Sequence, residues 1–357
     1  MLDPIAALDA LPDGLLKRSG INPTAAHPDS DACARMDLAE LARLTGELVI
    51  ARDGRPRPAS DHAVMSMGML STDYLMGMSR ALERLMVRQF DVGTEHRRFC
   101  ARKNAPDFRP VELPTADLGD GLHEQAELSE VRHDELRINR GEVLKLRSFG
   151  TALKVSRRVI VNDQWDTLAE AFSALGGSAG RLEGRMVYDA LENTDTLADG
   201  EPVFHADHGN RVESALTKAG LSQAMAALRT MKINLGRKAE PANMTARHLV
   251  VSAASELEAN ELLHTAGLEY NGRQLVTETG AGVSVTATPH LPAGRWYLLP
   301  DPTVFPVVAV LSMNDRGWPI TVGPTRLPSD RFDGIALKFL ADLGVGMVSR
   351  LAIRGGE

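Results

Sequence analysis

The sequence predicts a mixed fold of class α+β, and three features of the chain carry that prediction. Residues 165–191 place apolar side chains at helical spacing over a long stretch. Residues 144–161 alternate apolar and basic side chains, which is the pattern of a half-buried strand. Residues 202–317 combine segments of both kinds. A chain of 357 residues, 43% of them hydrophobic, can form one large domain or two to three smaller ones.

The N-terminal part is expected to contain helices joined by connectors. Residues 1–35 are rich in Pro, Asp, Ala and Gly, so we expect an extended or partly ordered arm with a short amphipathic piece at Ile5–Leu16. Residues 36–50 have leucines at helical spacing. After a proline-bearing connector over 51–61, a second helix is expected over 71–90, capped by the serine at its start.

A long hairpin is expected over residues 108–142. Its tip is Gly119-Asp120-Gly121, a strong turn signal. Its apolar residues are spread thinly, and an isolated two-stranded hairpin is marginal in water. We therefore expect the hairpin to project from its own chain and to be ordered by a neighbouring one.

The strand over 144–161 is followed by the long helix over 165–191, with Asn162-Asp163 as the expected cap. Gly176-Gly177 interrupts the helical pattern, and each glycine lowers helix stability by about 1 kcal/mol relative to alanine. We expect one long helix that is bent or loosened at this pair.

The C-terminal half is expected to form a compact mixed domain over 202–317, followed by a last set of strands over 318–357. Helices are predicted at 221–235 and 255–266, and strands at 248–252, 283–288, 296–299 and 307–313. Apolar residues alternate over 335–353, which predicts a hairpin of two strands there.

The composition excludes several classes of function. The formal charge is −7, whereas strong nucleic-acid binders are usually basic, so we expect no DNA-binding module. Two cysteines, Cys33 and Cys100, do not make a disulfide framework. No apolar run reaches the roughly 18 residues that span a bilayer, and residues 1–20 lack a signal-peptide pattern. We therefore expect a soluble, intracellular chain with no membrane partner.

The best candidate for chemistry is the segment over 205–208. His and Asp are standard metal ligands, and a turn could bring His205, Asp207 and His208 together. This set has no obvious fourth group, so we favour hydrogen bonding at a domain crossing, with Gly209-Asn210 supplying the turn. The chain has no Gly-x-Ser-x-Gly elbow and no P-loop. We assign no catalytic, cofactor-binding or metal-binding residue and no cofactor; a metal-dependent hydrolase using these three side chains is the alternative.

Charge is segregated along the chain. Between residues 80 and 103, seven basic residues face three acids, and between 112 and 142, nine acids face three basic residues. The basic residues of the first segment are Arg80, Arg84, Arg88, Arg97, Arg98, Arg102 and Lys103. The acids of the second are Glu112, Asp117, Asp120, Glu124, Glu127, Glu130, Asp134, Glu135 and Glu142. Two interpretations stay open: two solvated faces, or complementary surfaces on neighbouring chains, where charge sets register more than affinity.

Several of these elements follow one another in an order and at a spacing that can be compared with those of a known family. They are Phe149-Gly150, Ser156-Arg157, Val161-Asn162-Asp163, the interrupted helix, Phe204 to Asn210, and the ending from Asp333-Gly334-Ile335 to Leu343-Gly344-Val345. The series covers residues 70–356 and resembles the major capsid proteins of tailed bacteriophages, which have the Hong Kong 97-type fold. Within that family it is most similar to the branch with Mu-like heads, in which the capsid segment is often encoded behind a prohead protease.

The resemblance implies a division of the chain into five segments. They are an N-terminal arm with helices (1–106), an extended hairpin loop (107–143), a peripheral domain with a spine helix (144–201), an axial domain (202–317), and the C-terminal strands of the peripheral domain (318–357). In such proteins the extended loop overlaps a neighbouring subunit, and the axial tips meet around five-fold and six-fold axes.

The resemblance also implies a structural protein, not an enzyme, that self-assembles through pentamers and hexamers into an icosahedral shell around double-stranded DNA. The implied partners are other copies of the chain, a portal, and a scaffold or protease during assembly. The implied location is the virion capsid, and the host cytoplasm during assembly. An encapsulin-type nanocompartment, which resembles the same fold but encloses protein cargo, is a further alternative; the long arm before residue 90 favours the phage interpretation.

Overall fold

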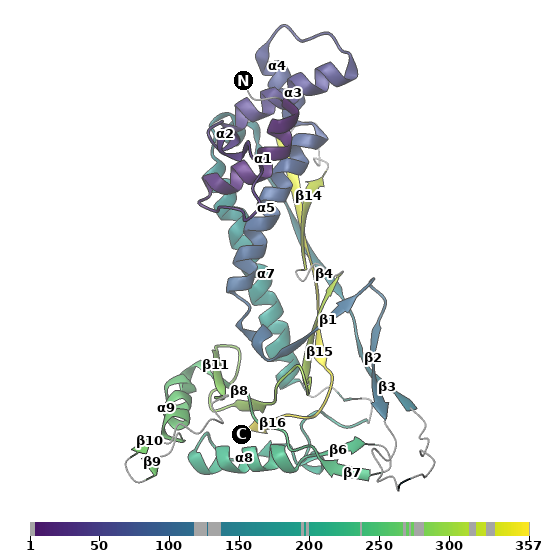
Figure 1. Ribbon diagram of the computed structural model, residues 1–357, viewed down its shortest axis with the longest axis vertical. Helices are drawn as coiled ribbons and strands as arrows, with labels where there is room; N and C mark the ends of the chain where they lie inside the picture. The colour runs from purple at the N-terminus through teal and green to yellow at the C-terminus, as the bar shows by residue number, and fades with distance from the viewer. Residues whose placement is uncertain are drawn as a thin grey trace. The chain divides into compact units, whose positions relative to one another are not determined.

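The computed structural model describes residues 4–117, 127, 137–193, 196–197, 200–235, 238–266, 269–270, 273–274, 282–313, 319–325 and 333–356 (Figure 1). The chain divides into two compact units, each built from several separate stretches of sequence. Unit 1 comprises 1–94, 148–182 and 318–342, and unit 2 comprises 95–147, 183–317 and 343–357.

Helices dominate unit 1 and are fewer in unit 2. They are α1 (Pro4–Arg18), α2 (Ser30–Ala34), α3 (Leu38–Asp53), α4 (Asp61–Met69), α5 (Thr72–Val92), α6 (Arg157–Val161), α7 (Trp165–Glu192), α8 (Lys218–Thr230) and α9 (Glu256–Ala266). Short 3-10 turns are η1 (Glu95–Arg98), η2 (Ala206–His208) and η3 (Ala253–Ser255). None of the helices within the described ranges is both long and apolar enough to cross a membrane.

The strands occur in both units, so the fold is mixed, as predicted. They are β1 (Cys100–Ala105), β2 (Val111–Asp117), β3 (Arg137–Leu144), β4 (Arg147–Ser156), β5 (Arg211–Val212), β6 (Lys232–Leu235), β7 (Lys238–Pro241), β8 (His248–Ser252), β9 (Glu269–Tyr270), β10 (Arg273–Gln274), β11 (Ser284–Thr288), β12 (Trp296–Leu299), β13 (Val308–Met313), β14 (Ile320–Thr325), β15 (Gly334–Met347) and β16 (Ile353–Gly355).

The N-terminal segment is folded, so the expectation of an extended or partly ordered arm is wrong for its described residues. Helix α1 buries Ala7, Leu11 and Leu15, which lie four residues apart and so share one face. The helix packs against α5, where a Cβ on Gly77 would lie 2.6 Å from the Leu11 side chain. The amphipathic piece that the sequence indicated is therefore a core element of unit 1.

Helix α5 confirms the helix predicted over 71–90 together with its cap. The Ser71 hydroxyl accepts a hydrogen bond from the backbone N–H of Tyr74 at 3.3 Å, which satisfies one of the free donors at the helix start. The helix predicted over 36–50 is α3, which begins after Asp37 and continues to Asp53.

Helix α7 confirms one long helix, and the helical conformation continues through Gly176-Gly177. The first part of α7 lies beside α5 (Figure 1). A Cβ on Gly176 would lie 2.3 Å from the carbonyl oxygen of Met86, and one on Gly180 would lie 2.8 Å from that of Phe90. Gly176 and Gly180 therefore permit α5 and α7 to approach each other closely. The bend expected at Gly176-Gly177 stays a prediction.

Two details of the segment before α7 correct the sequence analysis. The strand predicted over 144–161 ends at Ser156, because residues 157–161 turn into helix α6 and bury Ile160. Asp163 does not cap α7: its carboxylate accepts hydrogen bonds from the backbone N–H of Leu38 (2.9 Å) and from the guanidinium of Arg18 (2.6 Å). It thus ties the start of α3 and the end of α1 to this segment.

The hairpin predicted over 335–353 is wrong, because β15 is one continuous strand of 14 residues. In unit 1 it pairs with β14 in antiparallel fashion, with Ala341 opposite Ile320. In unit 2 its last residues pair with β13, which is parallel to β1. Gly344 is no turn residue: a Cβ there would lie 2.7 Å from the carbonyl oxygen of Lys145, so close backbone packing requires glycine.

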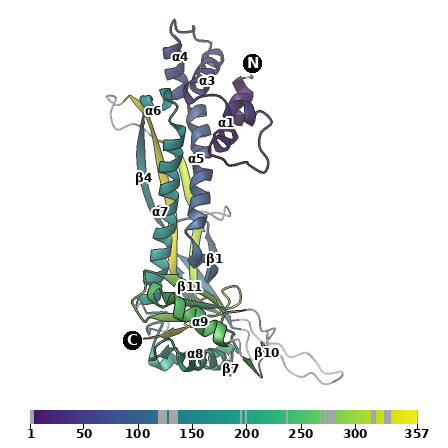
Figure 2. The same ribbon diagram turned by 90° about the vertical axis from the view of Figure 1, so that its left-hand side faces the viewer.

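A second sheet of unit 2 has the order β11-β8-β12-β16-β5. Helices α8 and α9 pack against it and lie near one another (Figure 2). Its core contains Trp296, Leu249, Val251 and Leu298. The four predicted strands and the helix over 255–266 are confirmed within one or two residues. The other predicted helix ends at Thr230 as α8, and its expected last residues form strand β6.

Candidate functional site

The segment over 205–210 forms a tight turn in unit 2. Gly209 has a φ of 63°, in the left-handed region that favours glycine. The buried Asn210 side chain holds the turn: its Nδ2 donates to the carbonyl oxygens of Val203 (2.7 Å) and Arg350 (3.2 Å). Its Oδ1 accepts from the backbone N–H five residues earlier at 3.0 Å. The predicted hydrogen-bonded turn at Gly209-Asn210 is confirmed.

The three candidate metal ligands of this turn are only partly brought together. His205 Nδ1 lies 3.4 Å from the Oδ2 of Asp207. His208 instead places its Nδ1 3.2 Å from the carbonyl oxygen of Val203. In the part of the chain that the structure describes, no group of three His, Cys, Asp or Glu side chains could hold a metal ion. The geometry of this segment is that of a hydrogen-bonded turn.

The predicted hairpin is present as strands β2 and β3, which pair in antiparallel fashion with Val111 opposite Leu144. The predicted tip at Gly119-Asp120-Gly121 lies outside the described residues. The root of the hairpin packs on β1 and β13 through Leu144 and Leu146. Its outer surface carries two large exposed apolar side chains, Phe108 (52% exposed) and Val143 (54% exposed). The root is therefore anchored in unit 2 and presents apolar surface to the solvent.

The basic segment over 80–103 is not a uniform surface. Arg84 forms an ion pair with Asp13 at 2.5 Å, and Arg97 is buried. The remaining basic residues of the segment are exposed: Arg80, Arg88, Arg98, Arg102 and Lys103. Two of the seven basic residues thus stabilise their own chain, so the complementary-surface hypothesis applies to the other five.

Arg97 belongs to a buried charge cluster with Glu183 of α7 and His96 of η1. Its Nε and Nη2 donate to the two carboxylate oxygens of Glu183 at 2.6 and 2.7 Å. His96 Nε2 lies 2.8 Å from Glu183 Oε1, and all three side chains are at most 6% exposed. We call this group the buried triad.

Two opposing effects set the pKa of the Glu183 carboxyl. Burial acts to raise it, while the hydrogen bonds and charges of Arg97 and His96 lower it and prevail, so the pKa lies below its ordinary value. The buried triad was not among the features predicted from the sequence. A signal was present, because Glu183 lies at helical spacing from the buried Ala179 and Val187.

Both cysteines are free and buried, which is consistent with the absence of a disulfide framework. Burial raises the pKa of the Cys33 thiol to about 11, and burial also raises the pKa of the Cys100 thiol well above its ordinary value. Neither thiol is poised as a nucleophile, because the reactive form is the thiolate.

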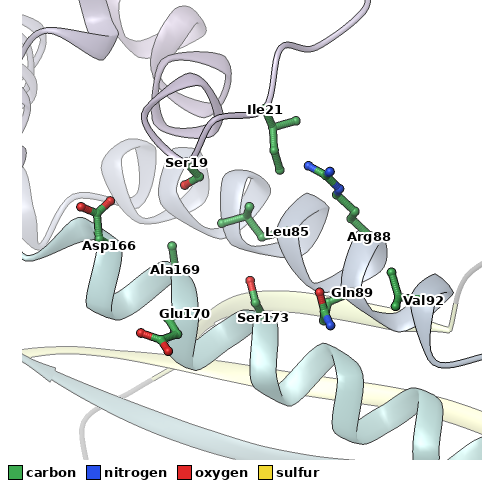
Figure 3. A pocket seen from close by; sticks show the side chains of 10 residues that line it. All are labelled: Ser19, Ile21, Leu85, Arg88, Gln89, Val92, Asp166, Ala169, Glu170 and Ser173. Atoms are coloured by element: carbon green, nitrogen blue, oxygen red, sulfur yellow. The ribbon is translucent and has the colours of Figure 1, made fainter.

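One hollow on unit 1 lies between α5, α7 and the segment after α1 (Figure 3). It is a cavity of about 430 Å³, and we call it the α5–α7 groove. Its lining residues are Ser19, Ile21, Leu85, Arg88, Gln89, Val92, Asp166, Ala169, Glu170 and Ser173. Leu85 and Ala169 lie between Arg88 on the α5 side and the two acids on the α7 side (Figure 3).

Comparison with known proteins gives one family match. Residues 141–353 match the family described as phage capsid protein. No curated protein matches the sequence.

The chain is also similar to solved structures of low sequence identity. One is the capsid of the Cyanophage P-SCSP1u, with 12% identity, a TM-score of 0.45, and coverage of 74% of this chain and 88% of that chain. A second is the virus-like particle from Pyrococcus furiosus, with 11% identity, a TM-score of 0.48, and coverage of 78% and 98%. A third is the holo-SrpI encapsulin complex from Synechococcus elongatus PCC 7942, with 11% identity, a TM-score of 0.46, and coverage of 86% and 94%.

The family match includes β4, the whole of α7, both helices of unit 2 that follow it, and most of the strands. It therefore covers more than half of the chain and elements of both units. Subunits of this family assemble with copies of themselves into a protein shell. The chain belongs to the phage capsid protein family, and it is a structural subunit of a capsid shell.

Proposed function

We propose that this chain is the major capsid subunit of a tailed phage with the Hong Kong 97-type fold, in the branch with Mu-like heads. The observation that carries the proposal is the family match over residues 141–353. Pentamers and hexamers of the chain form an icosahedral shell, and each contact can be weak because many act together. The subunit has no catalytic role in this proposal.

The five segments follow from the same proposal. Residues 1–106 are the N-terminal arm, here with helices, and residues 107–143 are the extended loop. Residues 144–201 and 318–357 form the peripheral domain, with α7 as its spine helix. Residues 202–317 form the axial domain, whose tips meet at the rotation axes.

The extended loop contacts a neighbouring subunit in this proposal. Among the described strands, β2 and β3 pair only with each other, and such a two-stranded sheet is marginal by itself. The exposed Phe108 and Val143 offer apolar surface to a partner. The five exposed basic residues of the 80–103 segment are the leading partners of the loop acids. Next are Arg158, Arg181 and Arg185. Arg157, which the sequence also suggested, forms an ion pair with Asp333 of its own chain at 2.7 Å.

The shell encloses double-stranded DNA without sequence-specific binding. A formal charge of −7 supports this, because a mildly acidic subunit surrounds DNA without adhering to it. A portal and a scaffold or protease act as partners during assembly in the host cytoplasm.

Electron microscopy of particles purified from cells that express the chain tests the proposal. We expect closed shells, and heads from an infected host should contain DNA and a portal. Shells that instead hold a co-expressed enzyme would identify a nanocompartment, and a monomer at all concentrations would overturn the proposal.

A further inference from the structure

The α5–α7 groove carries opposite charges on its two sides that are not paired with each other within one subunit. Arg88 on α5 is exposed, and so are Asp166 and Glu170 on α7. In the described part of the chain, none of the three forms an ion pair or a side-chain hydrogen bond. Nearby Arg84 shows the contrast, because it is paired with Asp13. The groove therefore presents a positive wall and a negative wall that do not neutralise each other.

Apolar side chains lie between and beside these walls. Leu85 and Ala169 form the floor and are almost fully buried. Val92, in the last turn of α5, is 68% exposed, and Ile21 lines the opposite rim. Figure 3 shows these side chains on α5, on α7 and on the segment after α1. Leu85 and Ala169 have little surface left to bury, so the apolar gain would come from Val92 and Ile21, at about 25 cal/mol per Å² of apolar surface removed from water.

A surface with opposite charges on its two sides is complementary to a second copy of itself. With a two-fold axis in the plane of the contact, midway between the two walls, Arg88 of one copy lies opposite Asp166 and Glu170 of the other. The acids of the first copy then lie opposite the arginine of the second, so every charge pair forms twice. The apolar floor then faces its own image across the axis.

We propose that the α5–α7 groove is a two-fold contact between two copies of this chain, in which Arg88 of each copy pairs with Asp166 and Glu170 of the other. The inference rests on the proposed shell, because two-fold axes relate neighbouring subunits of an icosahedral particle. It adds a contact of the helical unit that is distinct from the extended loop. It also assigns Arg88 to this contact, which leaves Arg80, Arg98, Arg102 and Lys103 as the exposed basic residues proposed to face the loop acids. The groove is lined by 10 residues, fewer than the roughly 20–30 residues a side of a standard interface, so this contact acts together with others.

Charge reversal and its rescue test the contact on the full-length chain. Three variants are needed: Arg88→Glu, Asp166→Lys with Glu170→Lys, and the triple change that exchanges the two walls. Arg43→Glu is the matched control, because Arg43 is an exposed residue of α3 and the substitution makes the same charge change outside the groove. The readout is the subunit concentration at which half of the protein sediments as assembled particles, at low ionic strength and in about 1 M salt, where the Debye length is ~3 Å.

We expect each one-sided reversal to raise that concentration by about tenfold at low salt, since every lost pair is lost twice. The triple variant should return to within about twofold of the parent, and the control should behave like the parent. In high salt, the differences should largely disappear. Unchanged circular dichroism and thermal midpoints show that the variants are folded; if Arg88→Glu is not, Arg88→Gln replaces it, with about half the effect.

Two results would overturn the proposal. The first is that either one-sided reversal leaves assembly unchanged. The second is that the triple variant assembles as poorly as Arg88→Glu, which would place the partner of Arg88 on another acidic surface such as the extended loop. Failure of the parent chain to form any particle would instead count against the proposed shell, so the two failures are distinguishable.

Discussion

Replacing Glu183 by glutamine should destabilise the subunit by about 3–5 kcal/mol. The carboxylate accepts two hydrogen bonds from Arg97 and lies 2.8 Å from His96 Nε2, and its side chain is only 1% exposed. Glutamine keeps the size and shape but removes the charge, so the Arg97 guanidinium, 6% exposed, loses its ion pair with the Glu183 carboxylate while it stays buried. Breaking a buried ion pair on one side has this cost because desolvation of the remaining charge is no longer offset.

Removing both charges separates electrostatic from packing effects. The double variant Glu183→Met with Arg97→Met should be less destabilised than Glu183→Gln, because replacing both partners by apolar groups of similar volume is often neutral. Asp189→Asn is the matched control, since Asp189 is exposed on the same helix and in the same unit. Its effect should stay within about 0.5 kcal/mol.

The assay is urea unfolding of the unassembled subunit, because association would add to the apparent stability. A loss below about 1 kcal/mol for Glu183→Gln would refute the argument that the buried triad is an electrostatic clamp. If the double variant has a lower free energy of unfolding than Glu183→Gln, the triad stabilises the subunit by more than avoiding an unpaired buried charge.

Four further predictions follow from the structure. Because the pKa of Glu183 is lowered, its contribution is fully present above the ordinary glutamate value and is lost as pH falls. The stability difference between the parent and Glu183→Gln, measured by urea unfolding, should therefore be constant near neutrality and shrink below about pH 4.3. Gly176→Ala should destabilise by about 1–3 kcal/mol, since its Cβ would lie 2.3 Å from the carbonyl oxygen of Met86, which is backbone and cannot move aside. Gly177→Ala, whose Cβ would meet only flexible side chains at 3.3 Å and beyond, should be neutral or stabilising by up to about 1 kcal/mol; equal losses for both would contradict the close-packing argument. Denaturing gels of mature heads should show a monomer band, because residues 113–141 contain no lysine to form an isopeptide crosslink; a ladder of covalent multimers would refute this. Chelation should leave folding and assembly unchanged, and about one transition metal per subunit with disassembly on chelation would contradict the absence of a metal requirement.

The elements that the sequence predicted well are those with strong local signals. Helix α5 has both a capping serine and a clear apolar stripe, and strands β8 and β12 are short apolar runs between polar turns. The turn at Gly209-Asn210 was predictable because glycine supplies its left-handed residue.

The errors arose where distant parts of the chain decide the structure. Gly176 and Gly344 look like breaks in a local pattern. At each position a backbone carbonyl from elsewhere in the sequence packs so closely that a Cβ atom would clash with it, so only glycine fits. Asp163 looks like a helix cap, but Leu38 and Arg18, more than a hundred residues away, take up its carboxylate. The buried triad and the α5–α7 groove likewise depend on side chains that only the tertiary fold brings together.

Assembly is the central claim, and electron microscopy of the purified full-length chain over a range of concentrations tests it most directly. We predict closed particles with icosahedral symmetry, in which two copies of the α5–α7 groove face each other across a two-fold axis. A protein that stays monomeric at every concentration and ionic strength, although folded, would contradict the account.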